Sequence, residues 1–114
     1  QCLRENVDLD MLLDMRRQLV AHHEALQEEA DRLRLLANST RLSILWLISR
    51  SPKKELCPCD LADILGITVP SVSQHLQRMR IGKLIANRRD GKTIFYSLLD
   101  AGATVANSDR LREG

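Results

Sequence analysis

The sequence CPCDLADILGITVPSVSQHLQRMRI, residues 57–81, predicts two short helices in succession. Pro58 suits the first position of the first helix, because the backbone N–H that proline lacks would have no partner there. Gly66 suits its end, where a left-handed backbone is needed. Thr68 is a plausible cap for the second helix, whose buried stripe we expect to comprise Val72, Leu76, Met79 and Leu84. Two short helices joined by Gly-Ile-Thr form a helix-turn-helix.

A β-hairpin is predicted directly after this pair of helices. Two strand-like runs, residues 84–89 and 92–98, flank the dipeptide Asp90-Gly91. Asp-Gly is a strong hairpin signal, and we expect positive φ at both of its residues. A hairpin in this position is a wing. Residues 99–114 have weak helical character.

Upstream, residues 8–36 have apolar side chains at roughly helical spacing and contain no glycine or proline. They form either one long helix or two helices with a bend near His22 and His23. A helix of this length cannot bury its whole apolar stripe against so small a domain, so we expect part of it to pack against a second copy of the chain.

A new helix is expected over residues 41–49, because Asn38, Ser39 and Thr40 can cap its first turn. Residues 50–56 are interpreted as a polar loop.

The predicted fold is mainly α-helical with a small β-hairpin. It is a winged helix-turn-helix that dimerises through its N- and C-terminal helices. We divide the chain into an arm and dimerisation helix (residues 1–27), a winged helix-turn-helix domain (28–100) and a C-terminal helix or tail (101–114).

The composition is that of a globular protein. The chain has 114 residues, of which 44% are hydrophobic and 28% charged. No apolar run approaches the about 20 residues of a membrane span, and no signal segment opens the sequence. We expect a cytoplasmic protein without a membrane partner.

The basic charge is local. The net charge is only +2, but residues 71–92 contain six basic residues against one acidic residue. Such a patch favours a polyanion as partner. Double-stranded DNA is preferred to RNA because the chain has one Phe, one Tyr and one Trp, too few for a base-stacking platform. A winged helix used for protein contacts is the alternative.

The predicted DNA contacts lie on two elements. The second helix carries polar side chains that reach base edges or phosphates in a major groove, with His75 at an intermediate angle. The wing adds cations suited to phosphate or minor-groove contact. Together the set comprises Ser71, Ser73, Gln74, His75, Gln77, Arg78, Arg88, Arg89 and Lys92.

Three cysteines, Cys2, Cys57 and Cys59, cannot all pair within one chain, so reduced thiols are expected. Cys57 and Cys59 flank Pro58 at a helix start, where free N–H groups favour a thiolate. Two thiolates so close together suit a soft metal ion. Cys2, on the N-terminal arm, is the predicted third ligand, from either subunit. The alternative is that the cysteines bind nothing.

No catalytic pattern is present. We find no nucleophile cluster, no glycine-rich phosphate loop and no HExxH pattern, so we predict neither an enzyme nor a small organic substrate. His22 and His23 point about 100° apart in a helix and cannot readily hold one ion. We interpret them as surface or interface residues.

Residues 30–100 resemble the ArsR/SmtB family of prokaryotic metal-responsive repressors. The resemblance rests on four motifs in the family's order: LANSTRL (36–42) at the entry to a core helix, ELCPCDLA (55–62) as a metal-binding box, SVSQHL (71–76) in the recognition helix, and RRDGK (88–92) followed by FYSL (95–98) in the wing.

The resemblance implies a homodimer that binds operator DNA when empty and leaves it when metal binds. Cys57 and Cys59 match the box cysteines of the cadmium/lead-sensing and arsenite-sensing branches. Ala62 stands where the arsenite branch often has a third cysteine, whereas Cys2 fits an arm cysteine of the cadmium/lead branch. Asp100 matches the zinc branch, but Gly102 replaces the expected histidine there.

The predicted effector is therefore a thiophilic metal or metalloid ion: Cd, Pb, Hg, As or Zn. Two alternatives remain open. The cysteines form a reversible redox switch in a DNA-binding repressor, or the chain is a metal-binding or protein-interaction module that does not bind DNA.

Overall fold

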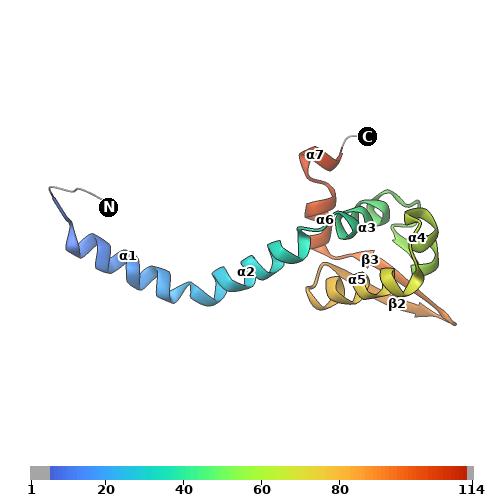
Figure 1. Ribbon diagram of the computed structural model, residues 1–114, viewed down its shortest axis with the longest axis horizontal. Helices are drawn as coiled ribbons and strands as arrows, with labels where there is room; N and C mark the ends of the chain where they lie inside the picture. The colour runs from blue at the N-terminus through green and yellow to red at the C-terminus, as the bar shows by residue number, and fades with distance from the viewer. Residues whose placement is uncertain (1–5, 113–114) are drawn as a thin grey trace. The chain divides into compact units, whose positions relative to one another are not determined.

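The computed structural model describes residues 6–112, and its internal contacts divide the chain between Arg32 and Leu33. The first unit contains α1 (Leu9–Ala21) and most of α2 (His23–Leu36) (Figure 1). Of the two arrangements expected for residues 8–36, the structure has the two helices, which meet at His22. No residue of α1 or α2 is buried.

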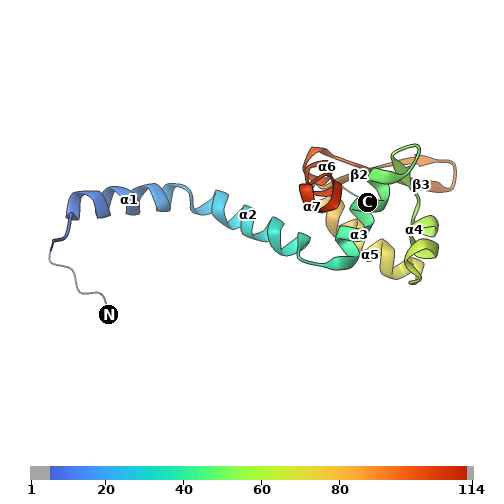
Figure 2. The same cartoon turned by 90° about the horizontal axis from the view of Figure 1, so that it is seen from above.

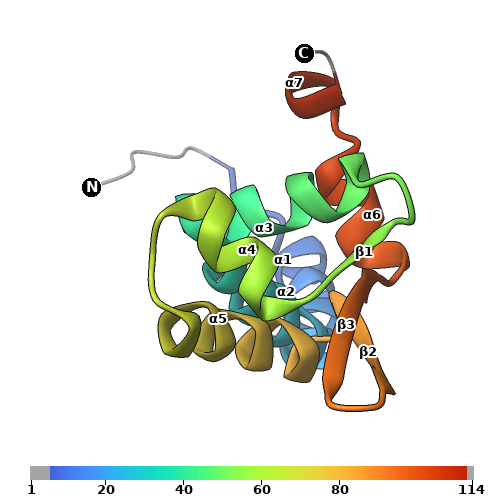
Figure 3. The ribbon, with the colours of Figure 1, turned by 90° about the vertical axis from the view of Figure 1, so that its right-hand side faces the viewer.

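The second unit is a winged helix-turn-helix. Its helices are α3 (Ser39–Arg50), α4 (Pro58–Leu65), α5 (Val69–Ile81), α6 (Asp100–Ala106) and α7 (Asp109–Arg112), and its strands are β1 (Glu55–Leu56), β2 (Ile85–Asp90) and β3 (Thr93–Leu98). The strands form an antiparallel sheet in the order β1-β3-β2. Figure 3 shows α4 and α5 stacked, with the β2–β3 hairpin beside them. The predicted fold class is confirmed.

The core lies between α3 and α5 and is completed by the base of the hairpin. Its fully buried side chains are Ile44, Leu45 and Ile48 of α3, Leu61 of α4, Val72, Leu76 and Met79 of α5, and Leu84 and Ile85. Helix α6 packs on α3 (Figure 2). Helix α7 is tied to α3, because the Nε1 of Trp46 donates to the carbonyl of Leu111 at 3.0 Å.

The predicted caps at Asn38 and Thr68 and the predicted ends of α4 agree with the structure, whereas α3 begins at Ser39, two residues before the expected start. The side chains of Asn38 and Thr68 accept hydrogen bonds from the first turns of α3 and α5. Cys57 is the N-cap of α4, with Pro58 at the first helical position, and Gly66 ends this helix at φ 69°. Side-chain caps supply partners for N–H groups that a helix start leaves free.

The strands also differ from the prediction in two details. Residues 55–56 form β1 within the expected loop, with Glu55 opposite Ser97 and Leu56 opposite Tyr96 on β3. The hairpin turn lies one residue later than expected, at Gly91-Lys92, because Asp90 pairs with Thr93. Only Gly91 has positive φ, 64°, in this turn, so the expected positive φ at Asp90 is wrong. Glycine at the first central position is typical of a type II′ turn.

Gly102 allows α6 to approach the hairpin closely. A Cβ atom at this buried position would lie 2.2 Å from the carbonyl oxygen of Leu84 and 3.4 Å from Leu45. That carbonyl also accepts a hydrogen bond from the N–H of Leu99, at 3.0 Å. Because the obstacle is backbone, a side chain at residue 102 forces the two elements apart.

We therefore expect Gly102→Ala to destabilise the protein by about 1–3 kcal/mol, although alanine is the better helix former. Urea unfolding followed by circular dichroism measures this. Gly82→Ala is the matched control, since the atom nearest to its Cβ would be a side-chain methyl group of Leu35, at 2.5 Å, and not backbone. Equal losses in the two variants would contradict the explanation.

Candidate DNA-binding surface and thiol site

Helix α5 has one buried face and one polar face. Val72, Leu76 and Met79 are buried. The predicted DNA contacts lie on the remaining surface: Gln74, Gln77 and Arg78 are exposed, and Ser71, Ser73 and His75 are half-buried. The basic residues Arg78 and Arg80 occupy the last turn of the helix.

His75 makes a contact that sequence reasoning missed. Its Nδ1 lies 3.3 Å from Nη1 of Arg41, a buried arginine of α3. The Nε of Arg41 also donates to the carbonyl of Leu35, in the last turn of α2, at 2.6 Å. Burial lowers the pKa of His75 from its ordinary value, and the positive charges of Arg41 and Arg78 lower it further.

The three wing cations have different surroundings. Arg88, Arg89 and Lys92 are all exposed. Arg88 is held by Glu55 of β1: its Nε donates to Oε2 at 2.9 Å, and its Nη2 donates to Oε1. The Arg88 guanidinium also lies 4.8 Å from the ring centroid of Phe95. Within the part of the chain that the structure describes, no ion pair holds Arg89 or Lys92.

The carboxylate of Glu55 is therefore a neighbour of the wing. Residue 55 was predicted to lie in a loop, and this contact was therefore not predicted from the sequence. The hydrogen bond from Arg88 lowers the pKa of Glu55 and raises that of Arg88. A solvated pair of this kind adds little to stability, because water screens its charges. It nevertheless determines where one wing cation lies in the absence of DNA.

The two thiols of the box lie at the start of α4. Cys57 is half-buried and its side chain makes no capping bond, while Cys59 is exposed in the first turn. Both are free thiols. Between residues 6 and 112, no group of three or more Cys, His, Asp or Glu residues is placed to hold a metal. The predicted third ligand, Cys2, lies outside the described residues.

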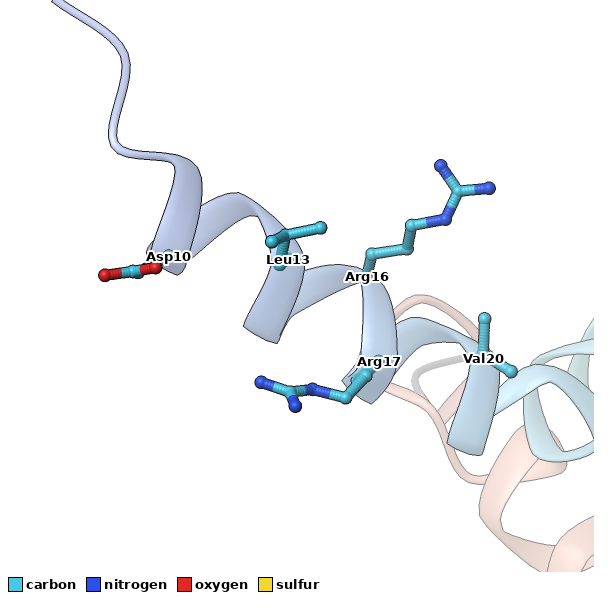
Figure 4. A pocket seen from close by; sticks show the side chains of 5 residues that line it. All are labelled: Asp10, Leu13, Arg16, Arg17 and Val20. Carbon is cyan, nitrogen blue, oxygen red and sulfur yellow. The ribbon is translucent and has the colours of Figure 1, made fainter.

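Helix α1 presents a separate apolar surface. Leu9, Leu12, Leu13, Met15, Leu19 and Val20 are all exposed. Figure 4 shows side chains of five residues of this helix, with Leu13 and Val20 among the charged Asp10, Arg16 and Arg17. His22 and His23 are exposed as well. The N-terminal unit thus has apolar side chains that no described residue of it buries.

Comparison with known proteins identifies the family. Residues 38–81 match the model of the bacterial regulatory protein family arsR. Over 99 residues the chain is 30% identical to the transcriptional repressor SmtB homolog of Synechocystis, covering 87% of this chain and 72% of that protein. The chain belongs to the ArsR family.

Other ArsR-family regulators are similar over shorter segments. The chain is 45% identical over 65 residues to the regulator KmtR of Mycobacterium tuberculosis, and 40% identical over 65 residues to the arsenical resistance operon repressor of Escherichia coli. Each alignment covers 57% of this chain, and 48% and 54% of those proteins respectively, so the chain spans about half the length of these relatives. Because these proteins are transcriptional regulators, the prediction that the chain is not an enzyme is confirmed.

Solved structures agree with the ArsR-family fold. Reduced HlyU from Vibrio cholerae has a TM-score of 0.66 at 27% identity, covering 80% of this chain and 95% of that one. The homodimeric winged helix-turn-helix domain of Mb0332 from Mycobacterium bovis has a TM-score of 0.64 at 26% identity, covering 92% and 82%. The antimony-specific repressor AntR has a TM-score of 0.58 at 35% identity, covering 66% of each chain.

One further feature of this ArsR-family chain bears on the zinc-branch site. Gly102, at the position where the resemblance expects a zinc-ligating histidine, is buried against backbone and leaves no space for a side chain. None of the helices over residues 6–112 is both long and apolar enough to cross a membrane.

The lowered pKa of His75 predicts a pH dependence of stability. Because the neutral ring is favoured in the folded state, its contribution is fully present above the ordinary pKa of 6.5 and is lost as pH falls through the lowered value. We expect the free energy of unfolding to fall between about pH 7 and pH 5, and to fall less in His75→Asn. Urea unfolding at several pH values measures this. The same dependence of unfolding free energy on pH in the wild type and in His75→Asn would contradict the prediction.

Because Glu55 holds Arg88, we predict that a DNA phosphate must compete with the Glu55 carboxylate for the Arg88 guanidinium. Glu55→Gln should therefore strengthen binding to mixed-sequence duplex DNA by up to about fivefold, and should steepen its salt dependence by up to about one counterion. Fluorescence anisotropy at several salt concentrations measures both quantities. Asp63→Asn, which removes an exposed carboxylate of α4, is the control; an equal gain there would mean that net charge alone is responsible.

Proposed function

We propose that the chain is a metal-responsive transcriptional repressor that binds operator DNA as a homodimer and releases it when a thiophilic ion binds. The observation that carries the proposal is the position of Cys57 and Cys59. They begin α4, and α4 packs directly against α5, the helix with the polar face. A ligand held by these two thiols acts on the element next to the DNA-reading helix.

The DNA contacts are assigned to α5 and the wing. Gln74, Gln77 and Arg78, with Ser71, Ser73 and His75 at the edge of the same face, match the donors and acceptors of base edges in the major groove. Arg89 and Lys92 are exposed cations available to phosphates. Arg88 joins them after it leaves Glu55.

A homodimer follows from the uncovered apolar side chains of α1 and from the symmetry of operators. Two copies place two recognition helices one DNA turn apart, which a palindromic operator requires. Burying α1 against a partner removes apolar side chains from water that are otherwise exposed. The repressor acts where its operator lies, in the cytoplasm.

The effector is assigned from the donor set. Cys57 and Cys59 supply two sulfur ligands, and Cys2 supplies a third from the same or the partner subunit. Sulfur ligands select soft ions, so the candidates are Cd(II), Pb(II), Hg(II), As(III) and Zn(II), and not Mg(II) or Ca(II). A bound ion supplies bonds that join the thiols at a fixed separation. The names of the Escherichia coli repressor and of AntR, which refer to arsenic and antimony, support this class.

The coupling between the two sites is a free-energy difference. Each tenfold loss of operator affinity requires about 1.4 kcal/mol of difference between the affinities of the ion for the two conformations. Cys57 caps α4 with extended backbone, φ −93° and ψ 162°, so a shift of its thiol moves the start of this helix. Since α4 rests on α5, such a movement changes the spacing of the two reading helices in the dimer.

Replacing Cys57 and Cys59 by serine should leave operator binding intact and abolish its release by cadmium, because serine keeps the size but not the soft donor. An electrophoretic mobility shift assay at increasing cadmium concentrations measures this, and thiolate-to-metal absorption follows binding of the ion directly. Cys2→Ser should weaken the response without removing the two box ligands. Release of the double variant at the wild-type cadmium concentration would show that the site is wrongly assigned.

A thiol redox switch is the second candidate function. The structural similarity to HlyU of Vibrio cholerae, whose matched structure is of the reduced protein, supports this candidate. Cys57 and Cys59 are separated by one residue, too close for an unstrained disulfide, so the oxidised form would join one of them to Cys2. Mild oxidation followed by non-reducing electrophoresis distinguishes the two. A disulfide-linked dimer that releases DNA without metal would favour the redox switch.

A further inference from the structure

Arg41 is a buried cation that is neutralised by no carboxylate. Its exposed fraction is 9%, and within residues 6–112 no ion pair involves it. The hydrogen bonds of its side chain go to two neutral acceptors, the carbonyl of Leu35 and Nδ1 of His75. A buried charge is costly unless its donors are used, so the bond to His75 helps to offset the cost of burying this guanidinium.

The bond between Arg41 and His75 determines where the proton of the imidazole lies. A guanidinium remains protonated and has only donors. Nδ1 of His75 must therefore accept, and it carries no proton. Because a neutral imidazole has one proton, that proton is on Nε2. The charged groups against the ring, Arg41 on α3 and Arg78 on α5, are both cations and oppose a second proton.

The remaining nitrogen of His75 is accessible. Nε2 has no hydrogen-bond partner among the described residues, yet no buried polar side-chain atom of these residues lacks one. Nε2 is therefore in contact with solvent. His75 has one nitrogen used inside the domain and one N–H left outside, on the helix assigned to DNA reading.

We infer that Arg41 is a positioning residue for the recognition helix: it ties α5 to α3 and to the end of α2, and holds His75 as the Nε2–H tautomer that presents a single donor to DNA. This inference rests on the proposed DNA-binding function. A donor matches the N7 and O6 of guanine, the N7 of adenine, the O4 of thymine or a phosphate oxygen. It does not match the amino groups of adenine or cytosine.

The first test uses the free protein. Nitrogen-15 NMR of the histidine rings distinguishes a protonated from an unprotonated nitrogen at neutral pH. We expect Nε2 of His75 to be protonated and Nδ1 unprotonated in the wild-type chain. In Arg41→Gln we expect a mixture of tautomers and a pKa closer to the ordinary value. A wild-type ring that is charged, or protonated on Nδ1, overturns the inference.

Arg50→Gln is the matched control, because Arg50 is also an α3 arginine that donates to backbone carbonyls. Its partners are Leu111 and Arg112 of α7, which lie away from α5 in sequence and structure. The control should leave the tautomer of His75 unchanged. Equal changes in both variants would mean that loss of any α3 arginine loosens the domain, which also overturns the inference.

The second test measures DNA binding to a duplex that the wild-type protein selects from a random-sequence pool. Arg41→Gln should lower affinity for this duplex roughly five- to tenfold, the effect of about one misdirected hydrogen bond. Its salt dependence should not change, because Arg41 is buried and neutralises no phosphate. Arg50→Gln should bind as the wild type does.

The outcomes separate the inference from the proposed function. If the wild type selects no duplex, the proposed DNA binding fails, and with it the role of Arg41 in DNA reading, whatever tautomer NMR finds. If the wild type binds and Arg41→Gln binds equally well, the repressor function stands and the positioning role is wrong. Should Arg41→Gln fail to fold, Arg41→Lys, which keeps the charge but cannot reproduce the two-armed donor geometry, replaces it in both tests.

Discussion

Burial of Val72, Leu76 and Met79 is the constraint on which the functional surface depends. These three side chains have no exposed area and lock one face of α5 into the core formed with α3. In the proposed function, the opposite face is therefore the one that enters the DNA groove. Rotation of α5 would take apolar side chains into water at about 1.5–3 kcal/mol each. The direction in which Gln74 and Gln77 are presented is therefore determined by the core and not by the polar residues themselves.

The features that the sequence predicts well are those with a local cause. The caps at Asn38 and Thr68, the proline start at Pro58 and the glycine stop at Gly66 each depend on one or two neighbouring residues. The break at His22 was foreseen only as one of two arrangements, because both keep the same apolar spacing. For the site, the sequence predicts Cys57, Cys59 and the polar face of α5, and these assignments stay predictions; it could not say which of the residues have partners.

The features that it missed depend on segments far apart in the chain. Strand β1 is two residues long, too short for any periodicity, and exists because β3 pairs with it. The same pairing brings Glu55 to Arg88, 33 residues away. Arg41 was treated as the start of a helix, whereas its side chain is buried against a residue 34 positions later. The turn was placed one residue early because Asp-Gly also suits a turn with two positive φ values, and only the strand register decides between the two.

These distant contacts change how the basic patch is understood. A count of charges treats all cations of residues 71–92 as equivalent. Their contacts show two kinds of cation, those with a carboxylate partner and those without one among the described residues. Arg88 has a carboxylate partner that DNA must displace, while Arg89 and Lys92 have none among the described residues. Outside the patch, Arg41 is a largely buried cation, and the role that we infer for it is exerted through His75. In the proposed complex with DNA, the electrostatic attraction thus comes from fewer side chains than the basic residues of the patch. In the same proposal, selectivity between sequences depends on Arg41, a buried arginine that a charge count would have assigned to the solvent.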